Sequence, residues 1–330
     1  MAAEATAPAD ADPSAPAPEA AGSASAAGGP ARSARSGPAT ARARAKVNLH
    51  LHVLGRRDDG LHLLDSLCVF PDVADGVTVR PAPPGTFTIE VTGPFASGAP
   101  ADSRNLALRA ALALAEAAGR GPGSAAPLGV ALSLEKVLPA AGGVGGGSAD
   151  AAAVLHLLNR EWGLDLSLER LSEIGLALGA DLPVCLRAPV PTLMRGIGED
   201  VRPAPGVPPL ALVLANPGVP TPTGEVFARL RRRDGAPCAL PAEGFATPGA
   251  LAAWLEGTAN MLEPPAREVA PAVADLIETL AAQPGCRLAR MSGSGATCFG
   301  LHETMASAEA GAAALRASGL WAAAGRSAGA

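Results

Sequence analysis

A glycine-rich loop at 142–147 (GGVGGG) constrains this chain more than any other segment. It lies between a predicted strand at 129–134 (GVALSL) and a predicted helix at 148–160, whose apolar residues share one face and whose first turn Ser148 can cap. Such a loop leaves backbone N–H groups unshielded, and the helix adds the positive end of its dipole. The pattern predicts an anion site suited to the phosphates of a nucleotide. A flexible linker is the alternative for the loop taken alone.

The loop fits neither of two common nucleotide motifs. A Walker A loop ends in Gly-Lys-Ser/Thr, whereas Gly147 is followed directly by Ser148. A dinucleotide fingerprint starting at Gly143 would need its third glycine at position 148, which is serine. A different kind of nucleotide site is therefore indicated.

Hydrophobic periodicity predicts an α+β fold in two domains. The first strand is expected at 45–55 (AKVNLHLHVLG), where apolar residues alternate with Lys46, Asn48, His50 and His52 to give one buried face and one polar face. Further strands are expected at 76–80, 86–92, 129–134, 210–215 and 296–301. Helices are expected at 104–118, 148–160, 168–178, 249–256, 270–282 and 305–317. A Pro/Gly-rich stretch at 203–209 (PAPGVPP) marks the boundary between the domains.

Residues 1–40 are mostly Ala, Pro, Ser and Gly without hydrophobic periodicity, which predicts a disordered extension. The extension lacks the central apolar stretch of a signal peptide, and its acidic residues argue against a transit peptide. A start codon assigned too early explains it equally well. A scaffolding role for this segment has no binding motif behind it.

The composition and charge of the chain limit the kinds of partner and the compartment expected for it. Lys and Arg number 26 against 31 Asp and Glu, a formal net charge of −5 that disfavours nucleic acid as a partner. The 5 cysteines, an odd number without a CxxC pair, argue against a disulfide framework or zinc site and for the reducing cytoplasm. No apolar run reaches the roughly 18–20 residues of a membrane helix, so no membrane partner is expected.

A series of motifs then points to one family. PAAGGVGGGSADAA (139–152) resembles the Pro-x3-Gly-Leu-Gly-Gly-Ser/Gly-Ser motif of the galactokinase, homoserine kinase, mevalonate kinase and phosphomevalonate kinase (GHMP) superfamily. AKVNLHLHVLGRRDDGLH (45–62) and LGADLPVCL (178–186) resemble signatures of the branch that acts on 4-(cytidine 5′-diphospho)-2-C-methyl-D-erythritol. RGIGED (195–200), NPGVPTPTGEVF (216–227), ANMLE (259–263) and MSGSGATCFG (291–300) follow in the expected order.

The resemblance covers about 45–300 and implies a two-domain kinase with its active site between the domains. It implies an ATP-binding domain at 41–205, like ribosomal protein S5 domain 2, and a ferredoxin-like α/β sandwich at 206–325. The implied reaction is phosphorylation of the C2 hydroxyl of the cytidine-diphospho-methylerythritol by ATP with Mg2+, a step of the non-mevalonate route to isopentenyl diphosphate. A monomer or homodimer is expected.

The resemblance assigns catalysis to two residues. Asp181, placed after a helix in a turn that opens a short strand, matches the aspartate that takes the proton from the substrate hydroxyl. Lys46 matches a lysine that keeps this aspartate ionised and offsets charge in the transition state. The alternative for Asp181 is a surface carboxylate at a helix end. Lys46 is one of only two lysines in the chain, so an incidental surface charge is less favoured for it.

The resemblance also assigns the ATP site. Asn105 and Lys136 match positions lining the adenine pocket, although Lys136 can also be read as a solvated surface lysine. The Ser148 hydroxyl is expected to approach Mg2+ or a phosphate oxygen, and Gly293, Ser294 and Gly295 to close over the site. The residues expected around the triphosphate are Pro139, Ala140, Ala141, Gly142, Gly143, Val144, Gly145, Gly146, Gly147, Ser148 and Ala149.

The acceptor site departs from the family pattern. The family reads Asp-Gly-Tyr-His, in which tyrosine stacks on the cytosine and histidine bonds to it, but this chain has no tyrosine and reads Asp-Gly-Leu61-His62. Phe227 matches the aromatic residue on the opposite face of the base, with Thr223 beside it; Asn48 is the fifth expected acceptor residue. We expect cytidine binding to survive on Phe227, His62 and an apolar Leu61.

Three alternatives stay open from the sequence. Because Leu61 stands where the family has tyrosine, a sister kinase that acts on homoserine or a mevalonate-type alcohol is one alternative, although His62 and the PTPTGEVF segment argue against it. A non-catalytic nucleotide-binding member is the second, disfavoured by the presence of Lys46 and Asp181. The spacing of His50 and His52 also permits a metal site, but without a third ligand nearby a polar strand face is favoured.

Overall fold

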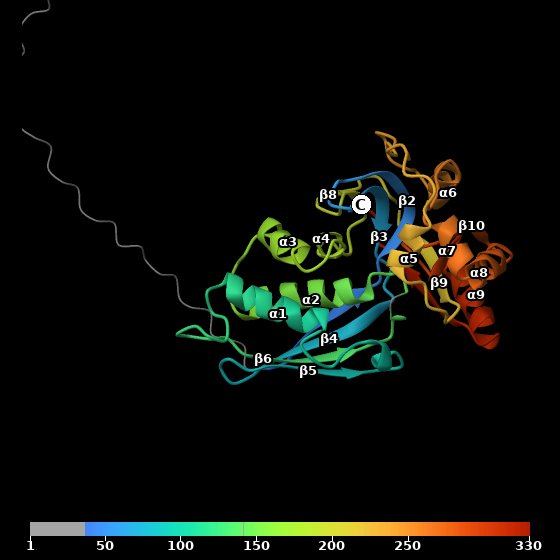
Figure 1. Cartoon of the computed structure of the whole chain (residues 1–330). Helices are drawn as coiled ribbons and strands as arrows, with labels where there is room; N and C mark the ends of the chain where they lie inside the picture. Colours follow the sequence, from blue (N-terminus) through green and yellow to red (C-terminus); the bar gives the residue numbers. More distant parts are fainter. Residues whose placement is uncertain (1–36, 141) are drawn as a thin grey trace, which may run out of the picture. The chain divides into compact units, whose positions relative to one another are not determined.

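Three four-stranded sheets carry the fold in the computed structural model, which describes residues 37–140 and 142–330 (Figure 1). The first sheet has the order β1-β4-β6-β5, with β5 and β6 parallel and the other neighbours antiparallel. Its strands are β1 (Ala39–Arg44), β4 (Ala74–Pro81), β5 (Phe87–Thr92) and β6 (Val130–Glu135). Helices α1 (Leu106–Ala117) and α2 (Gly146–Glu161) cover one face of this sheet (Figure 1), and α3 (Leu168–Leu176) and α4 (Leu182–Cys185) share their hydrophobic cluster.

Strand β1 corrects the predicted disordered extension at 1–40. Residues 1–36 lie outside the described residues, but Ala39 and Thr40 are the first two residues of β1. Ala39, Ala41 and Ala43 face the core, whereas Thr40 and Arg42 are exposed. Because the inward side chains are only methyl groups, this alternation carries little hydrophobic signal.

The second sheet, of order β2-β3-β7-β8, is antiparallel throughout. Its strands are β2 (Val47–Arg56), β3 (His62–Val69), β7 (Thr192–Gly196) and β8 (Asp200–Pro203). The alternation predicted for β2 is confirmed, but its polar face is enclosed rather than solvated, because Asn48 and His50 are fully buried. On the other face, Val47 and Leu49 pack in a cluster with Leu212 of the third sheet.

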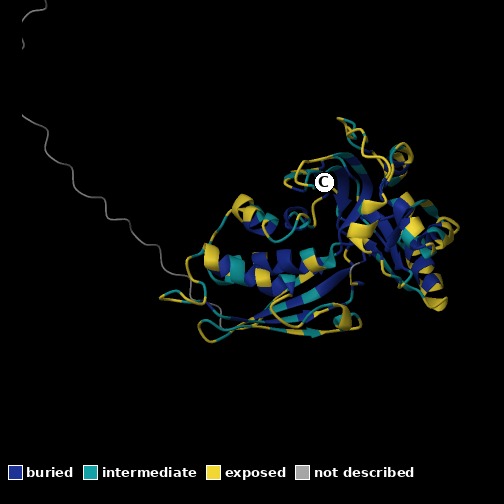
Figure 2. Ribbon diagram, in the orientation of Figure 1, coloured by how far each residue is buried: buried dark blue, intermediate teal, exposed yellow. Residues whose placement is uncertain are grey.

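The third sheet has the antiparallel order β10-β11-β9-β12. Its strands are β9 (Ala211–Asn216), β10 (Cys286–Met291), β11 (Cys298–His302) and β12 (Trp321–Arg326), and the helices of this region are α5 (Thr223–Ala228), α6 (Pro248–Glu256), α7 (Glu263–Val269), α8 (Ala272–Ala281) and α9 (Met305–Ala317). Helices α8 and α9 pack with the sheet in one cluster, whereas α6 packs in the cluster that reaches β2 and β3. Figure 2 shows the resulting concentration of buried residues in the strands and along the inner sides of the helices.

The strands and helices for which the sequence predicted residue ranges are confirmed, with ends shifted by at most two residues, but the short strand expected after Asp181 is the helix α4 (Leu182–Cys185). The sequence missed strands β1, β3, β7, β8, β10 and β12 and helices α4, α5 and α7. These elements are short or rich in small and polar residues, as in WAAAGR of β12, so long-range pairing decides their structure. None of the helices in the described part of the chain is both long and apolar enough to cross a membrane.

Candidate active site

A cavity of about 670 Å3 gathers most of the predicted site residues. Those that line it are Lys46, Asn48, Leu61, His62, Gly142, Gly143, Gly145, Gly146, Gly147, Ser148, Asp181, Thr223, Phe227, Gly293 and Ser294. They come from β2 and the residue before it, the β2–β3 turn and the start of β3, the glycine loop and the first turn of α2, the segment before α4, α5 and the turn after β10. The cavity therefore joins residues from both predicted domains.

Lys46 and Asp181 form an ion pair in this cavity, with 2.8 Å between Lys46 Nζ and Asp181 Oδ2. The Lys46 side chain is 4% exposed and that of Asp181 is 41% exposed, so the carboxylate keeps its access to a substrate. Burial is the largest single influence on the pKa of Lys46 and would lower it, but the Asp181 carboxylate together with the Cys68 and Cys185 thiols holds that pKa above its ordinary value. The pair thus presents a fixed ammonium beside a reachable carboxylate.

The position of Asp181 corrects a detail of the prediction. Asp181 precedes the short helix α4 rather than a strand, and Pro183 lies in the first turn of that helix, where a missing N–H does no harm.

Burial raises the pKa of the neighbouring Cys68 thiol to about 11, so this thiol is neutral beside Lys46. A second thiol close to Lys46, that of Cys185, is also buried and has a raised pKa.

The glycine loop lies against Lys46. The Lys46 N–H donates to the carbonyl of Val144 at 2.9 Å, and a Cβ added to Gly145 would lie 3.4 Å from the Lys46 side chain. Gly145 has a φ of 63° and is the N-cap of α2, where a left-handed conformation favours glycine. The loop thereby brings the start of α2 next to the ion pair.

Helix α2 begins at Gly146, two residues before its predicted start. Ser148 is therefore inside the first turn and is not the capping residue, which corrects the sequence prediction. In the described part of the chain, no side chain caps the first N–H groups of α2. Sixteen residues long and open at its N-terminus, α2 can bind an anion in the cavity.

The predicted glycine motif at 293–295 does lie over the loop. A Cβ on Gly143, whose φ is 74°, would come within 2.4 Å of the Ser292 carbonyl oxygen. Ser292 Oγ donates to the Gly143 carbonyl at 3.1 Å and accepts from the Asn48 N–H at 3.1 Å. Two glycine segments and β2 are thus held together around the cavity.

Six of the residues predicted around the adenine and the triphosphate do not line the cavity: Asn105, Lys136, Pro139, Ala140, Val144 and Ala149. A seventh, Ala141, lies outside the described residues. The Asn105 side chain caps α1 by accepting from the Ala107 N–H at 2.9 Å. Lys136 is buried, so its reading as a solvated surface lysine is wrong. Contacts of these residues with a nucleotide stay a prediction.

Two aromatic side chains also line the cavity: the rings of His62 and Phe227 stack with centroids 4.5 Å apart and an interplanar angle of 23°. Leu61 beside them is 48% exposed. Burial together with Arg233 and Arg56 lowers the pKa of His62, so the ring is neutral near pH 7. The Thr223 and Ser294 hydroxyls share a 2.8 Å hydrogen bond. A flat apolar subsite with one imidazole suits an aromatic base.

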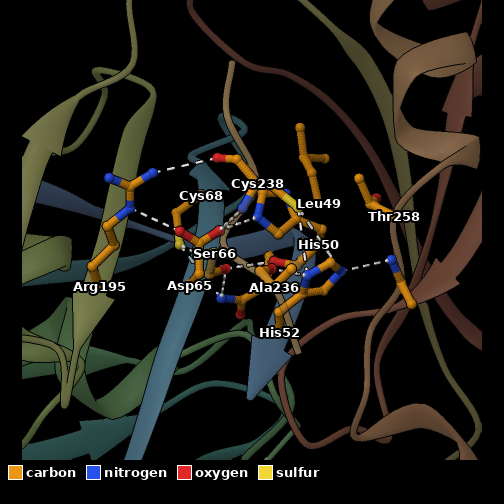
Figure 3. A network of polar contacts seen from close by, with 12 residues as sticks. Leu49, His50, His52, Asp65, Ser66, Cys68, Arg195, Ala236, Cys238 and Thr258 are labelled. Atoms are coloured by element: carbon orange, nitrogen blue, oxygen red, sulfur yellow. Dashed lines mark hydrogen bonds and ion pairs between the residues drawn. The ribbon is translucent and has the colours of Figure 1, made fainter. Parts of the chain in front are cut away.

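Asn48, on the cavity wall, hydrogen-bonds into a buried polar network, of which Figure 3 labels His50, Asp65, Ser66 and Arg195. Asn48 Nδ2 donates to Ser66 Oγ at 2.8 Å, and Ser66 Oγ donates to the His50 carbonyl at 2.6 Å. His50 Nε2 lies 3.0 Å from Asp65 Oδ1, and Arg195 Nε donates to Asp65 Oδ2 at 2.7 Å. The network anchors the Asn48 side chain, which the sequence marked only as an acceptor residue.

The same network places two other potential metal ligands, Asp65 and Cys238, beside His50, while His52 is not part of this cluster. His50, Asp65 and Cys238 have ligand atoms within 4.8 Å of one another, whereas His52 bonds to the carbonyl of Ala236. Both Asp65 oxygens are already used, because Oδ1 also accepts from the Cys238 N–H at 3.1 Å. A guanidinium on the carboxylate disfavours a cation, so these contacts support the polar-face reading of His50.

Several cavity residues were not expected from the sequence. Leu51, Leu64, Leu106, Met194, Ile197 and Leu262 contribute apolar surface to the wall. They belong to elements scattered through the chain, and an isolated leucine or methionine in a sequence reads as core. No local signal distinguishes them.

Comparison with known families gives two matches. The model of the GHMP kinases N terminal domain matches residues 105–188, and the model of the GHMP kinases C terminal region matches residues 239–319. Each match lies within one of the two predicted domains that contribute residues to the cavity.

Similar proteins and solved structures indicate the same family as these two models. A 4-diphosphocytidyl-2-C-methyl-D-erythritol kinase of Dinoroseobacter shibae is 48% identical over 260 residues, covering 79% of this chain and 84% of the relative. The enzyme of that name from Cereibacter sphaeroides ATCC 17029 is 49% identical, covering 83% and 94%.

A crystal structure of 4-(cytidine 5′-diphospho)-2C-methyl-D-erythritol kinase superposes with a TM-score of 0.70 at 35% identity, covering 88% of this chain and 100% of that chain. Homoserine kinase from Cytophaga hutchinsonii, at 18% identity and a TM-score of 0.60, covers 90% and 96% and shares the fold.

Proposed function

Since the chain belongs to the GHMP kinases, among their 4-diphosphocytidyl-2-C-methyl-D-erythritol kinases, we propose that it phosphorylates the C2 hydroxyl of 4-(cytidine 5′-diphospho)-2-C-methyl-D-erythritol with ATP. The product is the 2-phosphate, on the non-mevalonate route to isopentenyl diphosphate. The enzyme acts in the cytoplasm as a monomer or homodimer. The observation that carries the proposal is that one cavity holds the Lys46–Asp181 ion pair together with the glycine loop and the uncapped N-terminus of α2.

Asp181 is the proposed base. Its exposed carboxylate accepts the proton of the C2 hydroxyl while the hydroxyl oxygen bonds to the γ-phosphorus and the bond from that phosphorus to the β–γ bridging oxygen breaks. ADP leaves as the other product. Lys46 holds the carboxylate in place through the ion pair and offsets the negative charge that spreads over the transferring group.

The phosphates are proposed to bind at the start of α2, where the Gly145–Ser148 backbone and the helix dipole face the cavity. A Cβ on Gly147 would meet nothing within 4 Å, so this part of the loop is open to a ligand. Ser148 offers a hard oxygen for Mg2+ on the cavity wall. Bound there with phosphate oxygens, Mg2+ would neutralise phosphate charge.

The ATP-binding domain is proposed at 41–205 and the second domain at 206–325.

The cytidine base is proposed to bind against Phe227, His62 and Leu61. His62 Nε2 is buried without a hydrogen-bond partner within 37–140 and 142–330, so a polar edge of the base would satisfy it. Asn48 and Thr223 complete the acceptor side.

Leu61→Tyr is expected to lower KM for the cytidine substrate about fivefold or more, because base–aromatic stacking contributes about 1–3 kcal/mol. Leu61 is exposed, so a larger ring has room. Steady-state kinetics should show the decrease with KM for ATP unchanged, and Leu61→Met, which adds no ring, should behave like the wild type. An unchanged or higher KM in the tyrosine variant would contradict this account of the base site.

The function itself is tested by a coupled ADP-release assay with Mg-ATP and three acceptors: the cytidine-diphospho-methylerythritol, homoserine and mevalonate. Turnover of the cytidine substrate alone, absent in Asp181→Asn, is the expected result. Turnover of only a plain alcohol would instead identify a sister kinase. Inactivity on all three acceptors with ATP still bound would favour a non-catalytic nucleotide-binding protein.

A further inference from the structure

A second ionic cluster lies beneath the glycine loop, outside the cavity. Lys136 Nζ hydrogen-bonds to Asp75 Oδ2 and, at 2.7 Å, to Asp150 Oδ2. All three side chains are at most 4% exposed, and none of them lines the cavity. We call this cluster the Asp75–Lys136–Asp150 triad. The Lys136 ammonium is directed to the two carboxylates, so any contact of this residue with a nucleotide would use its other atoms.

The triad holds both ends of the loop. Asp75 Oδ1 accepts from the N–H groups of Val137 at 2.6 Å and Leu138 at 2.8 Å, which are the first residues of the segment leading into the loop. Asp150 belongs to α2, which begins where the loop ends. Lys136 bridges the two carboxylates and so connects the entry of the loop to its exit.

The backbone of Lys136 is held by hydrogen bonds to neighbouring segments. Its N–H donates to the Thr92 carbonyl at 2.8 Å, and its own carbonyl accepts from the Phe95 N–H at 3.1 Å. Gly93 approaches so closely that an added Cβ would lie 2.6 Å from the Lys136 carbonyl oxygen. The side chain therefore extends from a backbone that neighbouring segments hold on both sides.

The triad also lies close to the first residue of α2. A Cβ added to Gly146, the first residue of α2, would lie 3.4 Å from Lys136 Nζ and 3.8 Å from Asp75 Oδ2. A loop with so many glycines loses much conformational entropy when it is ordered. Fixed anchors at its two ends reduce the conformations open to it before ATP binds, which raises affinity.

We propose that Asp75, Lys136 and Asp150 are positioning residues that hold the glycine loop in the conformation that binds the phosphates of ATP. The inference rests on the proposed function, because it takes the loop as the ATP site. It predicts an effect confined to ATP, since the hydrogen bonds and ion pairs of the triad among the described residues do not involve the acceptor residues Leu61, His62 and Phe227.

Lys136→Met in the full-length chain is the test. KM for ATP, and the dissociation constant of a non-hydrolysable ATP analogue with Mg2+ measured by calorimetry, are expected to rise at least tenfold. KM for the cytidine substrate is expected to stay within twofold. Asp150→Asn should keep both ATP values within threefold of the wild type, because its amide oxygen still accepts from Lys136.

Two further variants keep the test decisive. Lys136→Met combined with Asp150→Asn leaves only one buried carboxylate uncompensated, so it serves if the single variant does not fold, with the same ATP-specific loss expected. Arg195→Met removes the cation from the equally buried Asp65, away from the loop, and should leave the analogue's dissociation constant unchanged.

Wild-type affinity for the analogue in a folded Lys136→Met protein would overturn the proposal. So would equal losses for both substrates, because they would mean that the triad only stabilises the fold. Failure of the wild type to phosphorylate any acceptor would refute the proposed function instead, and calorimetry with the analogue would still decide the role of the triad.

Discussion

Asp181→Asn is expected to lower kcat by about 10²–10⁴-fold, the range typical for removal of a general base. The amide has nearly the shape of the carboxylate but cannot accept the proton of the C2 hydroxyl. KM for ATP should change little, because the glycine loop and α2 do not depend on this side chain. Steady-state rates of ADP release on the cytidine substrate measure the effect.

Asp200→Asn is a matched control for that variant. Asp200 is similarly exposed, at 35% against 41% for Asp181, and pairs with Arg202 at 2.7 Å, but it does not line the cavity. Its replacement should leave kcat unchanged. Comparable rates for the two variants would show that Asp181 is not the base and that another group accepts the proton.

Lys46→Met is expected to lower kcat by about 10²–10³-fold, comparable to the loss of one preorganised donor at a developing charge. Methionine fills a similar volume against Gly145 but carries no ammonium. Protein stability should change by less than about 1 kcal/mol, because the Asp181 carboxylate left behind is partly solvated. Thermal melting followed by circular dichroism, together with kinetics, separates the two effects.

A Lys46→Met protein with wild-type kcat would contradict the role given to the ammonium. A protein that loses activity only because it unfolds would show a large fall in its melting temperature, which is not expected. Removing the cation from a fully buried carboxylate is a different case, since a buried unpaired charge costs far more. That contrast is why Lys136 needs the double variant and Lys46 does not.

Much of the fold followed from the sequence because its longer elements have strong local patterns. The alternation in β2 and the apolar stripe of α2 each define a backbone geometry without reference to the rest of the chain. β1 and β12, rich in alanine, have no such pattern and form because neighbouring strands supply their hydrogen-bond partners. The sequence also could not show that the polar face of β2 is enclosed, because enclosure depends on what packs over it.

By itself, the sequence determined the chemistry available to this protein: a glycine loop before a helix, a lysine on the first predicted strand and an aspartate after a helix, in an order that matches one family. Only the tertiary structure decided how those groups meet. It joins Lys46 to Asp181, moves Ser148 inside α2, and turns Lys136 away from the cavity towards Asp75 and Asp150. The physical reason is that periodicity and spacing report local backbone geometry, whereas ion pairs between distant residues depend on how sheets and helices pack.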